Sequence, residues 1–291
     1  SNSFCTLLAP GSSPAFAMNT HASIAARLSA ATLADIEGLN PDTAGFCRPE
    51  CCGETPPTDL PNSIPNLDLH LLVGTAVPSS KWDKLAVGIN GYGAVQAKLK
   101  ADKAAKVTLF HAVESATATV VDEATPMPML AFRANPQGMA ITQFTGVPEG
   151  ELPFDAKGAV AVDRTEERFV FVCSHRQRDD RCGYCGPVLV DLLRKAIAER
   201  RQQQPQSVAA PIHVYPCSHI GGHAYAGNVV VYTKHGGRCF GCITPAHVDE
   251  LVDYLAVHRD AKVPPALRPF LRGCVGPALP DEDPAATLPT A

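Results

Sequence analysis

The second half of the chain has the most regular pattern of apolar and polar positions. A run of aliphatic and aromatic residues at 168–172 predicts a buried strand, and apolar positions three and four residues apart at 187–202 predict an amphipathic helix. Thr244 followed by Pro245 is a helix start signal, because threonine caps backbone amides and proline fits the first helical turn. Further strands are expected at 211–215, 227–232 and 239–243, with a turn at 235–237.

The first half alternates less regularly but also predicts both helix and strand. One helix is expected at 92–105, and Trp82 is expected to pack in the core. The residues before this region contain one helical stretch at 22–36 and a proline-rich run at 56–61 that cannot pair as a central strand. Strands are expected at 67–73, 107–111, 116–121 and 128–134.

These elements predict an α/β protein with two domains. The C-terminal domain has the order βαβ followed by ββα, which is typical of a thioredoxin-like fold. Its tail is rich in proline, alanine and acidic residues, so we expect the tail to be disordered. The predicted division is an N-terminal arm and linker at 1–65, an α/β domain at 66–165, the thioredoxin-like domain at 166–275 and the tail at 276–291.

Composition narrows the class of protein. The chain has 291 residues, 45% of them hydrophobic and 19% charged, with a formal charge of −4, which is typical of a soluble globular protein. It has no basic excess to neutralise phosphates, so nucleic acid is not an expected partner. No apolar run approaches the roughly 18 residues of a spanning helix, so we expect no transmembrane segment.

Eleven cysteines are many for this length, and an odd number cannot all be paired in disulfides. They lie around aliphatic strands and helices that need no cross-links, unlike the cysteines of small secreted frameworks. We therefore expect metal ligation in an intracellular reducing compartment, without distinguishing the cytosol, the mitochondrial matrix and the plastid stroma. The chain begins Ser-Asn-Ser rather than with Met, which is consistent with removal of a targeting segment.

Two loops hold the candidate ligands, and each follows a predicted strand, so both should lie at the same end of the sheet. The loop at 173–186 carries three cysteines among arginines near a helix N-terminus, and both surroundings lower a thiol pKa. The loop at 217–228 carries His219 and His223 with two glycines between them. That spacing predicts a tight turn at which the backbone passes close to a bulky inorganic group.

Two stretches resemble a known family. Residues 173–187, with the core Arg-Asp-Asp-Arg-Cys-Gly, and 219–232, with the run His-Ile-Gly-Gly-His-Ala-Tyr-Ala-Gly-Asn, are similar to the signatures of the sucrase/ferredoxin-like family. These proteins are bis-histidinyl relatives of the thioredoxin-like ferredoxins. The resemblance is specific over 168–258 and weaker over 66–165. It implies a [2Fe-2S] cluster bound by a Cys-x8-Cys pair and a His-x3-His pair, here Cys173, Cys182, His219 and His223.

Such a cluster implies one-electron transfer. Two thiolates and two neutral imidazoles neutralise the +2 oxidised core, so adding an electron should be easier than in an all-cysteine cluster. If the ring N–H groups are exposed to solvent, electron transfer should be coupled to proton transfer. Around the ligands we expect supporting roles for Arg181, His175 and Asn228. Without a nucleotide-binding fingerprint, the electron donor or acceptor should be another protein or a small reductant rather than a bound flavin or nicotinamide.

Three alternatives remain open. Cys182-x2-Cys185 and Cys239-x2-Cys242 have the paired spacing of a structural zinc site. Cys182 and Cys185 before a helix also resemble a dithiol motif that exchanges disulfides. The domain could instead be an accessory subunit whose N-terminal arm binds a larger complex. The roles of the remaining thiols stay undetermined: Cys47, Cys51, Cys52, Cys185, Cys217, Cys239 and Cys242.

Overall fold

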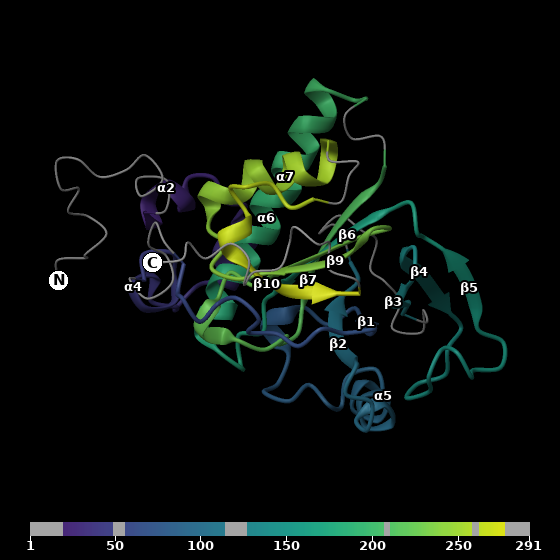
Figure 1. The fold of residues 1–291 in the computed structure, drawn as a ribbon. Coiled ribbons are helices and arrows are strands. Elements are labelled where there is room, and N and C mark those ends of the chain that lie inside the picture. The colour runs from purple at the N-terminus through teal and green to yellow at the C-terminus, as the bar shows by residue number, and fades with distance from the viewer. Residues whose placement is uncertain (1–19, 49–55, 114–126, 207–209, 258–261, 277–291) are drawn as a thin grey trace.

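The computed structural model describes residues 20–48, 56–113, 127–206, 210–257 and 262–276 (Figure 1). Within them, ten strands form one mixed sheet with the order β10-β9-β8-β6-β7-β2-β1-β3-β4-β5. Helices α6 and α7 pack against each other on one side of the sheet, and α5 packs against β2 on the other. The protein is therefore mixed α/β, as the sequence predicts.

The first half of the chain forms one flank of the sheet. Strands β1 and β2 are parallel, β3 pairs antiparallel with β1, and β4 and β5 each pair antiparallel with the strand before them. Leu71 and Val73 pack with Trp82 and Val95 of α5 in one apolar cluster, and Trp82 is fully buried as expected. The elements are β1 Leu69–Thr75, α5 Tyr92–Leu99, β2 Ala105–His111, β3 Met129–Asn135, β4 Gly138–Thr145 and β5 Val160–Asp163.

The second half forms the other flank and carries the long helix α6. Strands β6 and β7 are parallel, whereas β8, β9 and β10 are antiparallel to their neighbours. The elements are β6 Arg168–Cys173, α6 Asp180–Gln203, β7 Ile212–Cys217, β8 Val229–Thr233, β9 Gly236–Phe240, α7 Val248–Val257 and β10 Leu271–Val275, with short 3₁₀ turns η2 Ser79–Lys81, η3 His223–Tyr225, η4 Pro245–His247 and η5 Arg268–Phe270.

The two flanks share one sheet and one large core. β2 pairs with β7 only through Phe110 and Cys217, and the backbone of Leu67 bridges that of Val275 at the far edge of β10. The large apolar cluster takes residues from both halves of the chain, including Phe132 and Phe171. The sheet thus crosses the predicted boundary near residue 165 without a break, and the division into two domains stays a prediction.

The described part of the N-terminal region packs onto the second half. Its helices are α2 His21–Ala25, α3 Ala30–Asp35 and α4 Pro41–Ala44, and the last two contact α6. Ile24 and Phe46 belong to the large core. The single helical stretch expected at 22–36 is wrong, because the Ser29 side chain caps a new helix at its start. The expected strand at 116–121 and tail at 277–291 lie outside the described residues.

Three element boundaries differ from expectation. Helix α6 begins at Asp180 rather than near Pro187, because the Asp179 side chain accepts the Arg181 amide and Pro187 sits inside the helix. The β8–β9 turn is at 234–235 rather than 235–237, so strand β9 begins at Gly236, three residues before the predicted start. Helix α5 ends at Leu99, six residues earlier than predicted.

A buried polar network joins the two flanks. His70 of β1 bonds through Nδ1 to the Tyr232 hydroxyl of β8 and through Nε2, at 2.8 Å, to the Thr108 hydroxyl of β2. The Phe132 ring stacks on Tyr232 with centroids 3.9 Å apart. Burial, with a smaller effect of the Lys106 charge, lowers the pKa of His70 to about 3. His70 is therefore a neutral histidine inside the fold.

His70 should make folding sensitive to pH. Its folded pKa lies far below the ordinary histidine value of 6.5, so below about pH 6.5 the unfolded chain binds a proton that the folded chain does not. The stability difference between the native protein and His70→Gln should change by about 1.4 kcal/mol per pH unit between pH 6 and 4, with the native protein losing more. Urea unfolding across this range measures it.

The matched control is His235→Gln, at the β8–β9 turn and outside the network. A His70→Gln profile parallel to that of the native protein would contradict the buried neutral state of His70.

Candidate metal centre

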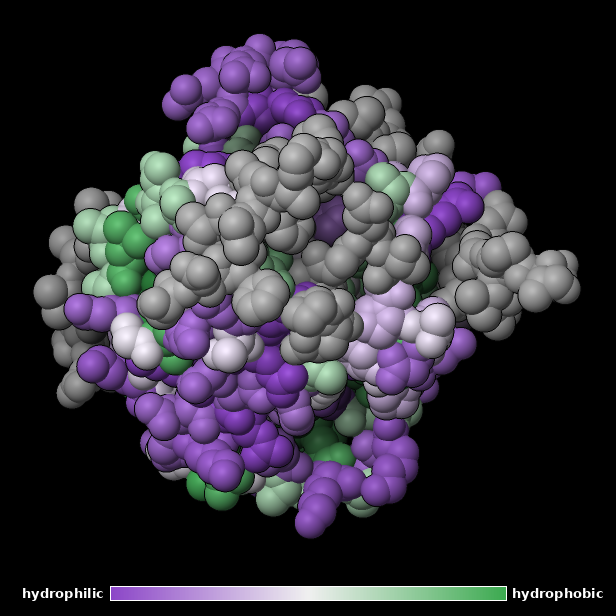
Figure 2. All heavy atoms as spheres, turned by 90° about the vertical axis from the view of Figure 1, so that its left-hand side faces the viewer, coloured by the Kyte–Doolittle hydropathy of each residue, from purple (hydrophilic) through white to green (hydrophobic). Residues whose placement is uncertain are grey.

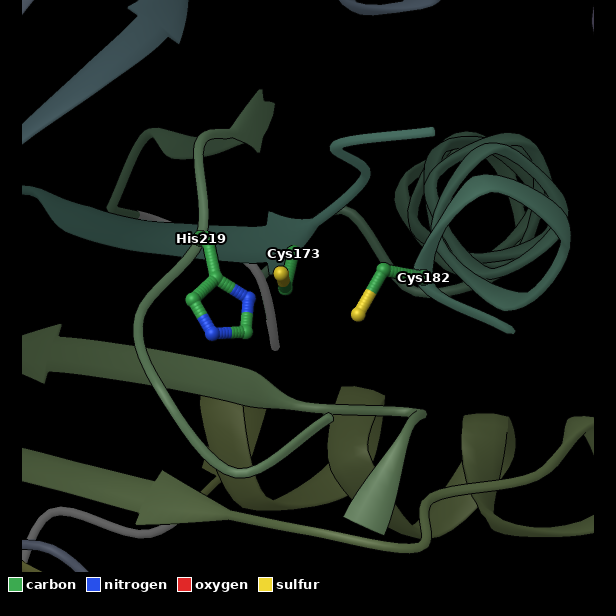
Figure 3. A group of neighbouring side chains, drawn as sticks. All are labelled: Cys173, Cys182 and His219. Atoms are coloured by element: carbon green, nitrogen blue, oxygen red, sulfur yellow. The ribbon is translucent and has the colours of Figure 1, made fainter. Parts of the chain in front are cut away.

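Two cysteines and one histidine converge at the ends of two parallel strands. Cys173 is the last residue of β6, Cys182 lies in the first turn of α6, and His219 follows β7. Cys173 and Cys217 are register partners, so the loops after β6 and β7 start side by side. The donor atoms of Cys173, Cys182 and His219 all lie within 4.8 Å of one another (Figure 3). In the described part of the chain no other set of three such donors is this close.

The donor set is buried and incompletely bonded. Both thiols are at most 1% exposed, and His219 Nδ1 is buried with no hydrogen-bond partner. Figure 3 shows one ring nitrogen of His219 turned toward the Cys173 sulfur. A buried nitrogen left without a partner costs about 1–3 kcal/mol. A metal bound by these three atoms removes that penalty, so the residues fit a soft metal ion or an iron–sulfur cluster.

The two thiols differ in acidity. The hydrogen bond from Cys182 holds the pKa of Cys173 well below its usual value despite burial, and the neighbouring His219 imidazole adds to this effect. The same contact with Cys173, together with burial, raises the pKa of Cys182. Of the two thiols, Cys173 is therefore the more acidic and loses its proton first.

His223 lies beside this group but not within it. Its ring centroid is 5.7 Å from that of His219. Its side chain is 51% exposed, and its Nε2 is 4.0 Å from an Asp179 carboxylate oxygen. The structure thus brings three of the four expected ligands within 4.8 Å of one another and places the fourth at the solvent edge of the same site.

A model of the sucrase/ferredoxin-like family matches residues 60–273. The chain belongs to this family. The match takes in both ligand loops and most of the first half, where the resemblance in sequence is weaker.

Curated relatives match over shorter stretches. Actin patches distal protein 1 of Saccharomyces cerevisiae is 34% identical over 118 residues, which are 39% of this chain and 37% of that protein. Altered inheritance of mitochondria protein 32 of Debaryomyces hansenii is 38% identical over 87 residues, 29% of each chain. The alignments therefore span well under two thirds of these relatives.

One solved structure is also similar. It is the thioredoxin-like [2Fe-2S] ferredoxin from Aquifex aeolicus, with 28% sequence identity, 31% of this chain and 84% of that chain covered, and a TM-score of 0.24. A TM-score this low does not establish a shared fold, so the thioredoxin-like class stays a prediction.

The three expected supporting residues have defined contacts. Asn228 is fully buried and donates to the Gly222 carbonyl at 2.9 Å, which fixes the turn between the two histidines. His175 bonds through Nε2 to the Asp83 carbonyl at 2.7 Å, while its buried Nδ1 has no partner. Arg181 pairs with Asp179 at 2.9 Å, so its charge is largely neutralised.

The other thiols face elsewhere. Cys185 donates to the Ala44 carbonyl, and burial raises the pKa of Cys217, and that of Cys239 to about 11.

The donor group shares only Cys182 with the alternative zinc set of Cys182, Cys185, Cys239 and Cys242. Cys182 and Cys185 are both fully buried, which disfavours disulfide exchange with another protein. Cys47 is disulfide-bonded, and Cys51 and Cys52 lie outside the described residues.

Two buried arginines hold the histidine loop and are not evident from sequence. Arg48 donates to the Ala226 carbonyl at 3.2 Å, and Arg272 donates to the Gly221 carbonyl at 3.0 Å. A side chain at Gly222, where φ is +66°, would place its Cβ 2.3 Å from Arg272. Gly222 is therefore required because the backbone passes close to Arg272. The sequence had instead suggested that the backbone passes close to an inorganic group.

Gly186 sets the approach of α6 to the donor group. A Cβ at Gly186 would lie 2.3 Å from Ser174 Oγ and 2.4 Å from the Cys173 carbonyl oxygen. Gly186→Ala should push α6 away, lower stability by about 1–3 kcal/mol and weaken metal binding through Cys182. Urea unfolding and a Co²⁺ titration measure the two effects.

Gly88→Ala is the matched control, because nothing lies within 4 Å of its added Cβ. Native stability and Co²⁺ affinity in Gly186→Ala would show that this contact does not position Cys182.

Proposed function

We propose that the protein is a [2Fe-2S] electron-transfer protein whose cluster is held by Cys173, Cys182, His219 and His223. The observation that carries the proposal is the convergence of two buried thiols and a buried, unpartnered imidazole nitrogen from two different loops. His223, one turn further along the second loop, supplies the fourth donor. A [2Fe-2S] core has two iron atoms, so its ligands need not all lie as close together as those of a single ion.

The donor chemistry suits a cluster that gains an electron readily. Two thiolates and two neutral imidazoles leave the oxidised core without net charge, so one added electron gives a single negative charge. A bound cluster would supply reversible one-electron transfer. Both cysteine ligands are buried, so water would not reach the cluster from the side of Cys173 and Cys182. His223 is half-exposed, so a protein donor or acceptor would approach the cluster at this histidine.

We propose a reducing compartment because seven of the eight described cysteines are buried thiols; the eighth, Cys47, is disulfide-bonded. No helix among the described residues is long and apolar enough to cross a membrane. On the face shown in Figure 2, the coloured residues are mostly hydrophilic with small apolar areas between them. The name of altered inheritance of mitochondria protein 32 favours mitochondria as the first compartment to examine.

A zinc site is the second candidate, and one observation favours it. Three donor atoms within 4.8 Å of one another also suit a single tetrahedral ion, with His223 or water in the fourth position. Zinc would be colourless and redox-inactive, so visible absorption and electron paramagnetic resonance distinguish the two candidates.

The cluster should be seen directly. Anaerobically purified protein should contain two irons and two sulfides per chain and give a paramagnetic signal on one-electron reduction. Cys173→Ser, Cys182→Ser and His219→Ala should each lose most of the iron, because each removes one donor of the buried group. Iron analysis, visible absorption and electron paramagnetic resonance measure these outcomes.

Cys274→Ser is the matched control, since Cys274 is a buried cysteine outside the donor group. A colourless protein with one zinc per chain would contradict the proposed function and support the second candidate.

The two histidines should raise the reduction potential. His223→Cys replaces a neutral ligand by a thiolate at the exposed edge, where the change disturbs packing least. The cluster should remain, and its potential should fall because the added negative charge disfavours reduction. A potentiometric titration followed by electron paramagnetic resonance measures the change, and His235→Cys, outside both ligand loops, serves as control. An unchanged potential in His223→Cys would exclude His223 as a ligand.

A further inference from the structure

The guanidinium of Arg272, on strand β10, lies directly behind the histidine loop. Its Nη1 donates to the Gly221 carbonyl at 3.0 Å and to Asn228 Oδ1 at 2.7 Å. Asn228 in turn donates to the Gly222 carbonyl at 2.9 Å. The carbonyls of Gly221 and Gly222, which lie between His219 and His223, are thus held by one linked pair of side chains.

The other side of the guanidinium is anchored to the N-terminal region. Nε donates to Ser63 Oγ at 2.9 Å and Nη2 to the Ser63 carbonyl at 3.2 Å. The guanidinium carbon also lies 5.2 Å from the centre of the Tyr225 ring. The side chain therefore has a single defined position, with contacts on both of its faces.

Every described acceptor of Arg272 is neutral. They are two backbone carbonyls of glycine and serine, an amide and a hydroxyl, and the described residues show no carboxylate in an ion pair with it. Arg272 is 1% exposed. A buried cation without an anionic partner carries a desolvation penalty of several kcal/mol that hydrogen bonds to neutral groups offset only in part. A source of negative charge close by would offset the rest.

We propose that Arg272 is the positioning residue of the histidine loop and the fixed positive charge that favours the reduced form of the bound cluster. This inference rests on the proposed function. Two thiolate ligands and an added electron are negative charge at the site to which the loop held by Arg272 contributes its two histidines. Two arginines of the thiolate loop are engaged elsewhere: Arg181 is paired with Asp179, and Arg176 binds backbone carbonyls of the N-terminal region.

The positioning role can be tested without a cluster. In metal-free full-length protein, amide hydrogen exchange of peptides covering 219–228 should be at least tenfold faster in Arg272→Met than in the native chain, because the two glycine carbonyls lose their anchor. Arg272→Lys keeps the charge but not the fork, so it should also speed exchange. Arg268→Met is the matched control, since Arg268 bonds to Val263 and not to the loop.

The charge role needs the reconstituted cluster. Arg272→Met should lower the reduction potential, and Arg272→Lys should keep it near the native value. Ser63→Asp, at a half-buried position, should lower the potential while leaving exchange of 219–228 unchanged, because it neutralises the guanidinium from the side away from the loop. Ser63→Asn is its uncharged control.

The outcomes separate the two proposals. A native chain that binds no iron contradicts the proposed function, while hydrogen exchange still decides the positioning role. A native chain with a cluster, together with native potential and native exchange in Arg272→Met, overturns the inference. If Arg272→Met fails to fold, two other comparisons decide. Native hydrogen exchange in Arg272→Lys would overturn the positioning role. Equal reduction potentials in Ser63→Asp and Ser63→Asn would overturn the charge role.

Discussion

The parallel pairing of β6 with β7 is the constraint on which the candidate site depends. The register that places Cys173 opposite Cys217 makes both strands end at the same level, so the loops that follow them leave the sheet together. Helix α6 starts within the first loop and brings Cys182 back over the strand end. A shift of this register by one residue would turn Cys173 to the other face of the sheet. The geometry of the donors is therefore a property of the sheet rather than of the loops alone.

The site carries several groups that are unfavourable by themselves. A buried imidazole nitrogen lacks a partner, the pKa values of two adjoining buried thiols are shifted in opposite directions, and a buried guanidinium bonds only to neutral acceptors. Protein interiors tolerate such groups when the surrounding packing is extensive, and here the large core lies beneath all of them. A bound metal would satisfy the first two and lower the penalty of the third. We infer that metal binding and folding stability are coupled at this site.

Local patterns in the sequence predicted most of the buried strands and both ligand loops. Strands β1, β2, β3, β6, β7 and β8 are short apolar runs, and such runs are readable without tertiary information. Strand β5 was missed because all four of its residues are exposed, and β10 because it carries a buried arginine and a glycine. Pro187 suggested a helix start, although α6 begins seven residues earlier. The pairing of Cys173 and Cys182 with His219 came from a resemblance to a family and not from periodicity.

The contacts that could not be predicted are those between distant parts of the chain. Arg48 reaches Ala226, and Arg272 reaches both Ser63 and Asn228, so residues near each end of the described chain meet on the same loop. During synthesis the two cysteines and two histidines leave the ribosome well before Arg272 does. The histidine loop consequently acquires its final shape only after Arg272 has been made. A metal inserted earlier would meet a loop that Arg272 does not yet hold. The site therefore reaches its final geometry only after Arg272 has packed against the loop.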